Sequence, residues 1–437
     1  MKRQAAAAAR NLDQMPVTET RRAQQANSLP RMPDALAAIV GSFAVGEARA
    51  TLEALSAKRF AGRRLGTGGH DRARDWLVTR MIALGLEVDV SHFDVHGILD
   101  LSAEPSFEIL EGRRVPRGAL EHRVAFAEHP RSAPLASSVV GPARHLDGLG
   151  NAGDWVISEA VPQGPSLLDW AHRLALTRAV GILTPQFPAA DGYLSKRIVG
   201  GNTVDLPVIA VRPDLLSKLQ GAVIRAAVPL TRIDARGANV AGVIAGSDPS
   251  QRTRPLVITA HYDGVGDDPG RRLPSAADNG SGVAVLLELA RVLAASAWRP
   301  PRPIVFVAVD GEEVGALGSR FHASALRNAG FQPQVLNLDM VARFTGTAAT
   351  EIGPASEPIV AALDRAGKWL EIPLTVAQVA SDNRSYANAG FPAVGVGMGA
   401  ASYHTPGDTA DRVEDEAMAL AGRLGLATAW LLCGRKS

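Results

Sequence analysis

The chain has 437 residues, of which 46% are hydrophobic and 21% are charged, an ordinary balance for a soluble globular protein. This length allows two domains, and a net charge of +2 argues against a dedicated nucleic-acid-binding protein. The single cysteine, Cys433, excludes an internal disulfide and a zinc site built from cysteines.

The first 33 residues are polar, and their pattern does not support an expectation of export. The alanine run in MKRQAAAAARNLDQ is short, and the pair Arg21-Arg22 is followed by AQQANSLP, where an export signal would have an apolar core. No span approaches the roughly 18 apolar residues that a membrane helix needs. We therefore expect residues 1–33 to form a mobile extension, and we expect a cytoplasmic protein without a membrane partner.

Helical patterns follow this extension. Residues 34–60 predict an opening helix, and RFAGRRLGTGGH predicts a glycine-rich turn after it. In residues 71–84 apolar side chains recur every three or four positions, which indicates one face of a second helix. Gly85 is a typical helix stop, and the following LEVDVSHFDV alternates as a half-buried strand does.

Residues 120–235 have a different pattern. The short strand candidates SSVVG, DWVIS, VGILTP and LPVIAV surround one helical stretch at 167–179, and acids and histidines do not cluster. We predict a small α/β or β-rich domain at 120–235, inserted into a larger domain formed by residues 34–119 and 236–437. We expect this insertion to shape access to a site and to be dispensable for its chemistry.

After residue 238 strands and helices alternate to the C-terminus. The predicted strands are NVAGVIAG, 256–259, 304–309, 335–338 and 393–398. The predicted helices are 283–294, 317–327, 357–370 and a last one from about 414. This alternation predicts an α/β fold with a mostly parallel central sheet flanked by helices.

In the stretch IVFVAVDGEEVGALGS, acidic residues directly follow an apolar strand. Its run 304–309 is typical of a strand buried on both faces, and it leads into Asp310, Glu312 and Glu313. Solvation at the protein surface is the simple explanation for acids at a strand end. However, open parallel sheets bind ligands at the carboxyl ends of their strands, which makes these acids candidates for chemistry.

Other potential metal ligands follow the remaining strands of the same half. They are His261, Asp263, Asp278, Asp339, Tyr403 and His404. Each has an ordinary explanation alone, such as a helix cap for Asp278. Because parallel strands share a direction, however, these side chains should converge on one edge of the sheet. Two histidines among carboxylates suit Zn²⁺ or a similar divalent ion.

With these motifs the sequence resembles the co-catalytic di-zinc aminopeptidases related to aminopeptidase S and aminopeptidase Y, and the related glutamate carboxypeptidases. The matching motifs, in family order, are AHYD, AADNGSGVA, GEE, NLDM, SDNRSYANAGFPAVGV and YHTPGDT. The resemblance covers about residues 45–110 and 236–437. The insertion at 120–235 is similar to the protease-associated domain that many members carry at this place.

The resemblance implies two zinc ions per chain. One ion would bind His261 and Asp339, the other would bind Glu313 and His404, and Asp278 would bridge the two.

It also implies roles for three further residues. Asp263 would orient the imidazole of His261 from behind, Glu312 would act as the general base, and Tyr403 would hydrogen-bond the developing oxyanion. The chain departs from the pattern at Asn383, where many relatives have histidine, and this change bears on substrate specificity.

The implied activity is that of an exopeptidase that acts on peptides, with an aminopeptidase as the first expectation. A carboxypeptidase or dipeptidase, or a glutaminyl cyclase, remains open because these enzymes share the scaffold. A non-catalytic receptor-like binding protein is disfavoured, because such relatives have lost metal ligands that are all present here. Nothing in the sequence predicts the oligomeric state.

Overall fold

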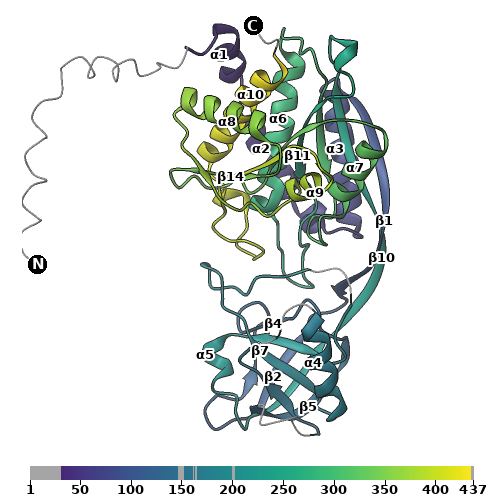
Figure 1. Ribbon diagram of the computed structural model, residues 1–437. Coiled ribbons are helices and arrows are strands. Elements are labelled where there is room, and N and C mark those ends of the chain that lie inside the picture. The colour runs from purple at the N-terminus through teal and green to yellow at the C-terminus, as the bar shows by residue number, and fades with distance from the viewer. Residues whose placement is uncertain (1–30, 146–151, 161, 163–164, 199–201, 435–437) are drawn as a thin grey trace, which may run out of the picture.

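The computed structural model describes residues 31–145, 152–160, 162, 165–198 and 202–434. Most of the predicted N-terminal extension lies outside these residues. The described chain forms two bodies, each built on its own eight-stranded sheet (Figure 1). The larger body comprises residues 31–101 and 230–434, and the smaller body comprises residues 102–229.

Four parallel strands form the centre of the larger sheet, in the order β12-β11-β13-β16. They are β12 (Ile304–Val309), β11 (Leu256–His261), β13 (Gln334–Leu338) and β16 (Ala393–Gly397). Antiparallel neighbours extend the sheet on both sides. These are β10 (Leu230–Ile244) and β1 (Glu87–Leu101) beyond β12, and β14 (Ala348–Ile352) beyond β16, where β15 (Leu374–Val376) ends the sheet. The predicted α/β class with a central parallel sheet is confirmed.

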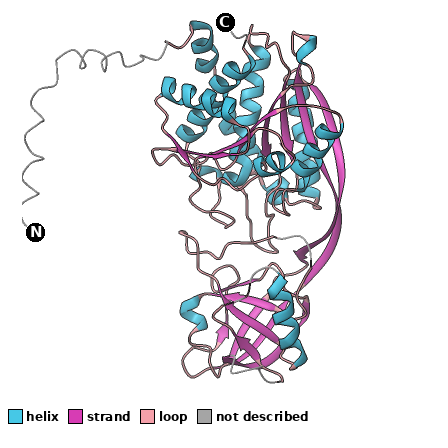
Figure 2. Cartoon of the chain, in the orientation of Figure 1, coloured by secondary structure: helices cyan, strands magenta, loops and turns pink. Residues whose placement is uncertain are grey.

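Helices cover both faces of this sheet (Figure 2). One face packs against α1 (Asp34–Gly41), α2 (Val45–Leu55), α3 (Gly68–Ala83), α6 (Ser281–Ala295), α8 (Glu357–Leu370) and α10 (Asp415–Cys433). The other face packs against the shorter α7 (Leu317–Asn328) and α9 (Asn383–Asn388). Successive residues of β11 and β12 alternate between the two cores, which explains why their sequences are apolar without interruption.

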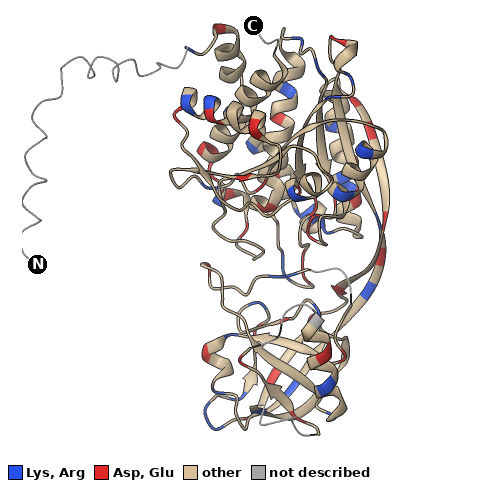
Figure 3. Ribbon diagram, in the orientation of Figure 1, with Lys and Arg blue, Asp and Glu red and all other residues tan. Residues whose placement is uncertain are grey.

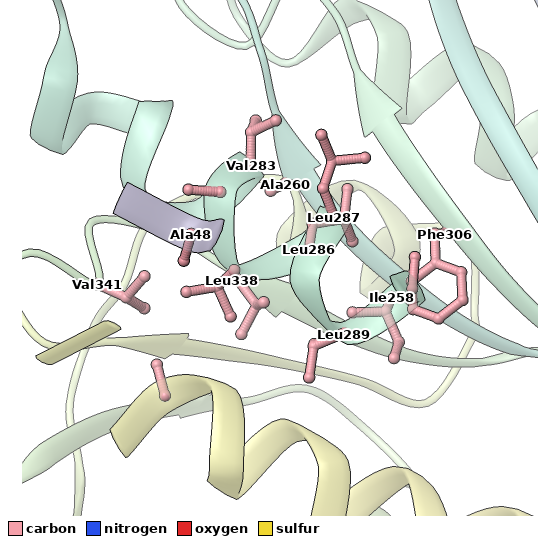
Figure 4. Packing of buried hydrophobic residues seen from close by; sticks show 14 of the residues in the cluster. Ala48, Ile258, Ala260, Val283, Leu286, Leu287, Leu289, Phe306, Leu338 and Val341 are labelled. Carbon is pink, nitrogen blue, oxygen red and sulfur yellow. The ribbon is translucent and has the colours of Figure 1, made fainter. Parts of the chain in front are cut away.

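The main core lies between the central strands and α6. Ile258 and Phe306 on the strands face Leu286 and Leu289 on α6, and Ala48 of α2 closes the layer (Figure 4). All five side chains are fully buried. Such burial contributes about 1.5–3 kcal/mol for each large apolar side chain, so this layer fixes the strand ends rigidly.

The predicted opening helix at 34–60 is interrupted. It forms α1, α2 and a short 3-10 turn, Lys58–Arg63. Phe43, between α1 and α2, packs so closely on α10 that a Cβ at Gly422 would lie 2.0 Å from its ring. The chain turns there because Phe43 is drawn into the core.

In the part of the smaller body that the structure describes there are eight strands and two helices. Its strands are β2 (Ser106–Glu111), β3 (Gly118–Ala119), β4 (Phe126–Glu128), β5 (Leu135–His145), β6 (Trp155–Ile157), β7 (Gly181–Pro185), β8 (Val208–Val211) and β9 (Val223–Val228). Its helices are α4 (Pro165–Leu176) and α5 (Pro213–Leu216). The sheet starts at residue 106, before the predicted boundary at 120, because β2 pairs with β9. The long pair β1 and β10 leads the chain into and out of this body (Figure 1).

Among the described residues, two helical segments are long and apolar enough to cross a membrane, by length and composition only. They are Asp34–Leu55 and Asp415–Cys433. In the second segment, α10, 67% of the apolar window is buried inside the fold, so packing accounts for its composition. Lys, Arg, Asp and Glu are interspersed over both bodies (Figure 3), as the small net charge suggests.

Candidate metal centre

The carboxyl ends of the central strands meet at one place. His261 is the last residue of β11, Glu313 lies in the turn after β12, and Asp339 directly follows β13. His404 lies in the loop after β16, and Asp278 immediately precedes α6. All five side chains are buried. The predicted ligands therefore converge as the parallel topology requires.

Their ligand atoms form two groups that share one residue. His261, Asp278 and Asp339 form the first group, and within it His261 Nε2 lies 3.2 Å from Asp278 Oδ1 and 3.5 Å from Asp339 Oδ2. Asp278, Glu313 and His404 form the second group. There, His404 Nε2 lies 2.9 Å from Asp278 Oδ2 and 3.0 Å from Glu313 Oε2. The two oxygens of Asp278 thus face different groups.

The donor set fits divalent metal ions. His261 Nε2 and Asp339 Oδ1 are buried and make no hydrogen bond within the described chain. Burying a polar atom without a partner costs free energy, and coordination to a metal ion would supply the missing partner for these two atoms. Imidazole nitrogens together with carboxylate oxygens are ligands that Zn²⁺ accepts.

The charges of the site stabilise one another. Burial alone would raise the pKa of Asp278, but the adjacent imidazoles of His261 and His404 outweigh it and hold that pKa below its usual range. Burial would lower the pKa of His404, but the charge of Glu313 and the hydrogen bond of Asp278 raise it to about 10. A metal ion would have to displace that proton, because histidine binds metals in its neutral form.

Asp408 holds the segment that carries Asp278. Its Oδ1 accepts a hydrogen bond of 2.6 Å from the Ala277 N–H, and its Oδ2 accepts one of 3.2 Å from the Asp278 N–H. Asp408 belongs to the YHTPGDT motif, so the sequence contained this signal, but its spacing did not reveal which backbone the carboxylate would reach.

Arg63 is fully buried and also holds the segment that carries Asp278. Its guanidinium donates to the carbonyl oxygens of Pro274 at 2.9 Å and Ser275 at 2.6 Å, and also to that of Tyr262 at 2.7 Å, next to His261. One side chain thus ties the end of β11 to the loop before Asp278. Sequence reasoning missed Arg63, because it treated RFAGRRLGTGGH as a turn.

Asp263 performs more than the predicted orientation of His261. Its backbone oxygen lies 3.2 Å from His261 Nδ1, and its Oδ1 lies 3.5 Å from the same nitrogen. The two carboxylate oxygens accept hydrogen bonds of 3.1 Å each from the backbone N–H groups of Glu312 and Glu313. Asp263 therefore also fixes the turn that carries both glutamates.

Asp310 belongs to a separate network. Both of its oxygens lie 2.9 Å from His70 Nε2, and Oδ2 also accepts from the Ala238 N–H at 2.8 Å and the Tyr262 hydroxyl at 3.1 Å. Of the three acids that follow the β12 strand, Asp310 thus joins α3 to the sheet, and it belongs to neither ligand group.

Glu312 and Tyr403 lie beside the ligands. Glu312 is partly exposed and belongs to neither group. Burial, together with neighbouring carboxylates, raises its pKa well above the usual range. Glu312 and Glu313 line a cavity of about 630 Å³, which Arg131 and Ile198 of the smaller body help to enclose. The Tyr403 ring is 47% exposed and stacks on the His404 imidazole at a centroid distance of 3.7 Å.

Asn383 is a packing residue at the start of α9. It is buried, and a Cβ at Gly395 of β16 would lie 2.8 Å from its Oδ1. The neighbouring Asp382 is fully buried, and burial raises its pKa to about 7. In this chain Asn383 therefore packs against the sheet, and an effect of this position on substrate specificity stays a prediction.

Residues 239–429 match the model described as Peptidase family M28. Aminopeptidase YwaD of Bacillus subtilis is 25% identical over 416 residues, which cover 87% of this chain and 83% of the relative. A probable zinc metalloprotease of Pyricularia oryzae is 40% identical over 113 residues, which are 25% of this chain and only 22% of the relative. The solved structure of BSAP, a zinc aminopeptidase from Bacillus subtilis, has a TM-score of 0.69 at 21% identity and covers 90% and 96% of the two chains. This likeness shows a common fold.

Proposed function

We propose that this chain, whose residues 239–429 match the model of peptidase family M28, is a zinc-dependent aminopeptidase that removes N-terminal residues from peptides. The observation that carries the proposal is the position of Asp278, whose two oxygens face two adjacent ligand groups. A buried carboxylate shared in this way is suited to bridge two ions.

Five side chains would hold two zinc ions. His261 and Asp339 would bind one ion, Glu313 and His404 would bind the other, and Asp278 would bind both. When bound, such a pair of ions polarises the scissile carbonyl and makes water a better nucleophile near neutral pH.

Glu312 is the residue placed to move the proton. It is adjacent to a ligand, belongs to neither group, and faces the cavity of about 630 Å³. Its raised pKa gives its carboxylate a high affinity for a proton. Glu312 would take a proton from the attacking water and deliver it to the leaving amine.

Tyr403 would stabilise the negative charge that develops on the carbonyl oxygen. Burial and the nearby charge of Asp278 raise the pKa of its phenol, so the hydroxyl stays protonated and able to donate. Stacking on His404 holds the ring beside the site. A preorganised donor of this kind contributes to catalysis because it strengthens as charge develops.

An assay with aminoacyl anilides tests the function. Substrates with a free α-amine should be cleaved, and the same substrates blocked at nitrogen should not. Chelation should abolish cleavage, and zinc should restore it. Cleavage that requires a free substrate carboxylate would instead identify a carboxypeptidase, and absence of any metal-dependent cleavage across the panel would favour a binding protein.

A further inference from the structure

A segment of the smaller body reaches the loop that carries His404. This segment, residues 186–198, is the part of the connection from β7 to β8 that directly follows β7, and it runs between the two bodies (Figure 1). The backbone N–H of Lys196 donates a hydrogen bond of 2.8 Å to the carbonyl oxygen of His404 itself. Five residues earlier, Asp191 Oδ2 accepts a hydrogen bond of 2.5 Å from the Thr405 hydroxyl. Two consecutive residues of the ligand loop are thus held by the smaller body.

The fit between the segment and the loop leaves little free space. A Cβ at Gly407 would lie 2.3 Å from Asp191 Oδ2, so a glycine is needed for the carboxylate to approach. The Gly407 N–H in turn donates to the Thr405 hydroxyl at 3.2 Å. Asp191, Thr405 and Gly407 therefore form one continuous contact directly beside the ligand.

His404 needs such support because its backbone is in the left-handed region, with a φ of 57°. For a residue other than glycine this conformation is strained, and it persists where the surroundings determine it. The hydrogen bond from Lys196 acts on the carbonyl of this same residue. The smaller body therefore stabilises the conformation that directs the imidazole toward Asp278 and Glu313.

The side chain of Lys196 anchors the segment in the larger body. Its ammonium is buried, lies 3.0 Å from Asp268 Oδ1 and donates to the Gly266 carbonyl at 3.1 Å. Arg123 of the smaller body also binds Asp268, with its Nε at 2.7 Å from Oδ2. Asp268 lies in the loop that joins His261 to Asp278. The His404 loop and the loop between His261 and Asp278 are thus both attached to the smaller body.

These contacts belong to a largely buried charge network at the junction of the two bodies, in which three cationic side chains face three carboxylates, and His122 adjoins it with its Nε2 3.0 Å from Glu128. Its members are Arg64, Arg123, Lys196, Asp100, Glu128 and Asp268. Removing one partner from such a network leaves an uncompensated buried charge. The network therefore fixes the position of the segment relative to the metal centre.

We propose that Asp191 and Lys196 are positioning residues that hold His404 in place for the metal ion it shares with Asp278 and Glu313. The inserted body is then a part of the metal centre's support, contrary to the expectation that it is dispensable for the chemistry. The inference rests on the proposed two-zinc site. It concerns metal affinity, so it can be tested without a substrate.

The primary test is a zinc titration of the full chain against a chromophoric chelator, with Asp191→Ala as the variant. Replacement of residues that orient metal ligands typically weakens metal affinity by about 10–100-fold. We expect a loss of this size for one of the two ions and an unchanged affinity for the other. Asp191→Asn keeps an oxygen that can accept from Thr405 and should restore most of the affinity. Asp169→Ala, an exposed position on α4, is the matched control.

Three further variants extend the test, and one of them covers the case in which Asp191→Ala does not fold. Lys196→Met should also weaken zinc binding, whereas Lys218→Met, at an exposed position of the same body, should not. If Asp191→Ala does not fold, Thr405→Val removes the same hydrogen bond from the other side and decides the question. When all fold, Asp191→Ala and Thr405→Val should be non-additive, because each removes one partner of a single contact.

The outcomes separate this inference from the proposed function. Folded Asp191→Ala and Lys196→Met proteins that bind two ions with wild-type affinity would overturn the positioning role and leave the peptidase proposal intact. A wild-type chain that binds fewer than two ions would overturn both the two-zinc site and this inference. A wild-type chain that binds two ions but cleaves no peptide would refute the function alone, while the titration still decides the positioning role.

Discussion

Replacing Glu312 with glutamine tests the proposed chemistry most directly. Gln keeps the size of the side chain but cannot accept a proton at neutral pH. The backbone N–H of residue 312 would still donate to Asp263, so the turn and the neighbouring Glu313 should stay in place. Because Glu312 belongs to neither ligand group, both ions should remain bound. The substitution therefore isolates the loss of the base.

The expected loss of rate can be estimated because the substitution removes only the base. A general base contributes about 10²–10⁴-fold to the rate, which corresponds to about 3–5 kcal/mol of transition-state stabilisation. Since Gln is isosteric with Glu, no cavity and no lost ligand adds to this figure. We expect kcat to fall by at least 10²-fold, with a smaller change in KM.

The assay combines steady-state kinetics on a free-amine substrate with elemental analysis of the same preparation. Glu313→Ala is the contrasting variant, because it removes a ligand and should lose metal together with activity. Near-normal turnover of Glu312→Gln with two ions bound would refute the role of Glu312 as base. Loss of metal from Glu312→Gln but not from Glu313→Ala would show that the two roles are exchanged.

Four other predictions follow from the described contacts. Chelation should lower the unfolding temperature as well as abolish activity, because the buried carboxylates then face one another without a cation; a calorimetric scan with and without chelator measures this. Arg63→Met should cost about 3–5 kcal/mol in urea unfolding, because it leaves buried carbonyls and Asp408 without their cation. Burial would lower the pKa of His70, but Asp310 outweighs it and raises the folded-state value. The stability that wild type gains over His70→Gln should thus be complete below about pH 6.5, the unfolded-state pKa, and should fall as the pH rises through the folded-state pKa; no such pH trend in denaturant titrations would contradict this. Gly318→Ala should destabilise by about 1–3 kcal/mol, because its Cβ would lie 2.2 Å from the Asp310 carbonyl oxygen.

Most elements of the larger body could be predicted because their signals are local. The runs at β11 and β12 are apolar throughout, as strands buried on two faces must be. The strands β14 and β15 at one side of the sheet were missed, since they are short and are defined by pairing, β14 with the distant β16 and β15 with β14. For the same reason the predicted start of the smaller body, residue 120, lies later than its first strand, because β2 belongs to this body only through its pairing with β9.

The ligands could be proposed from sequence because each lies at the end of a strand or the start of a helix. What surrounds them could not. Arg63 and Asp408 act on backbone groups that are far from them in the chain, and no residue pattern specifies such partners. Asp310, adjacent to the site in sequence, belongs instead to a network with His70.

By itself the sequence determined the strand–helix alternation and, through it, the edge of the sheet where His261, Glu313 and Asp339 gather. Both follow from periodicity and from the common direction of parallel strands, which are properties of short segments. Only the tertiary structure decided that Asp278 faces two ligand groups and that Asp191 and Lys196 hold the His404 loop. Those relations join residues up to some two hundred positions apart, and they exist only once both bodies are folded and packed together.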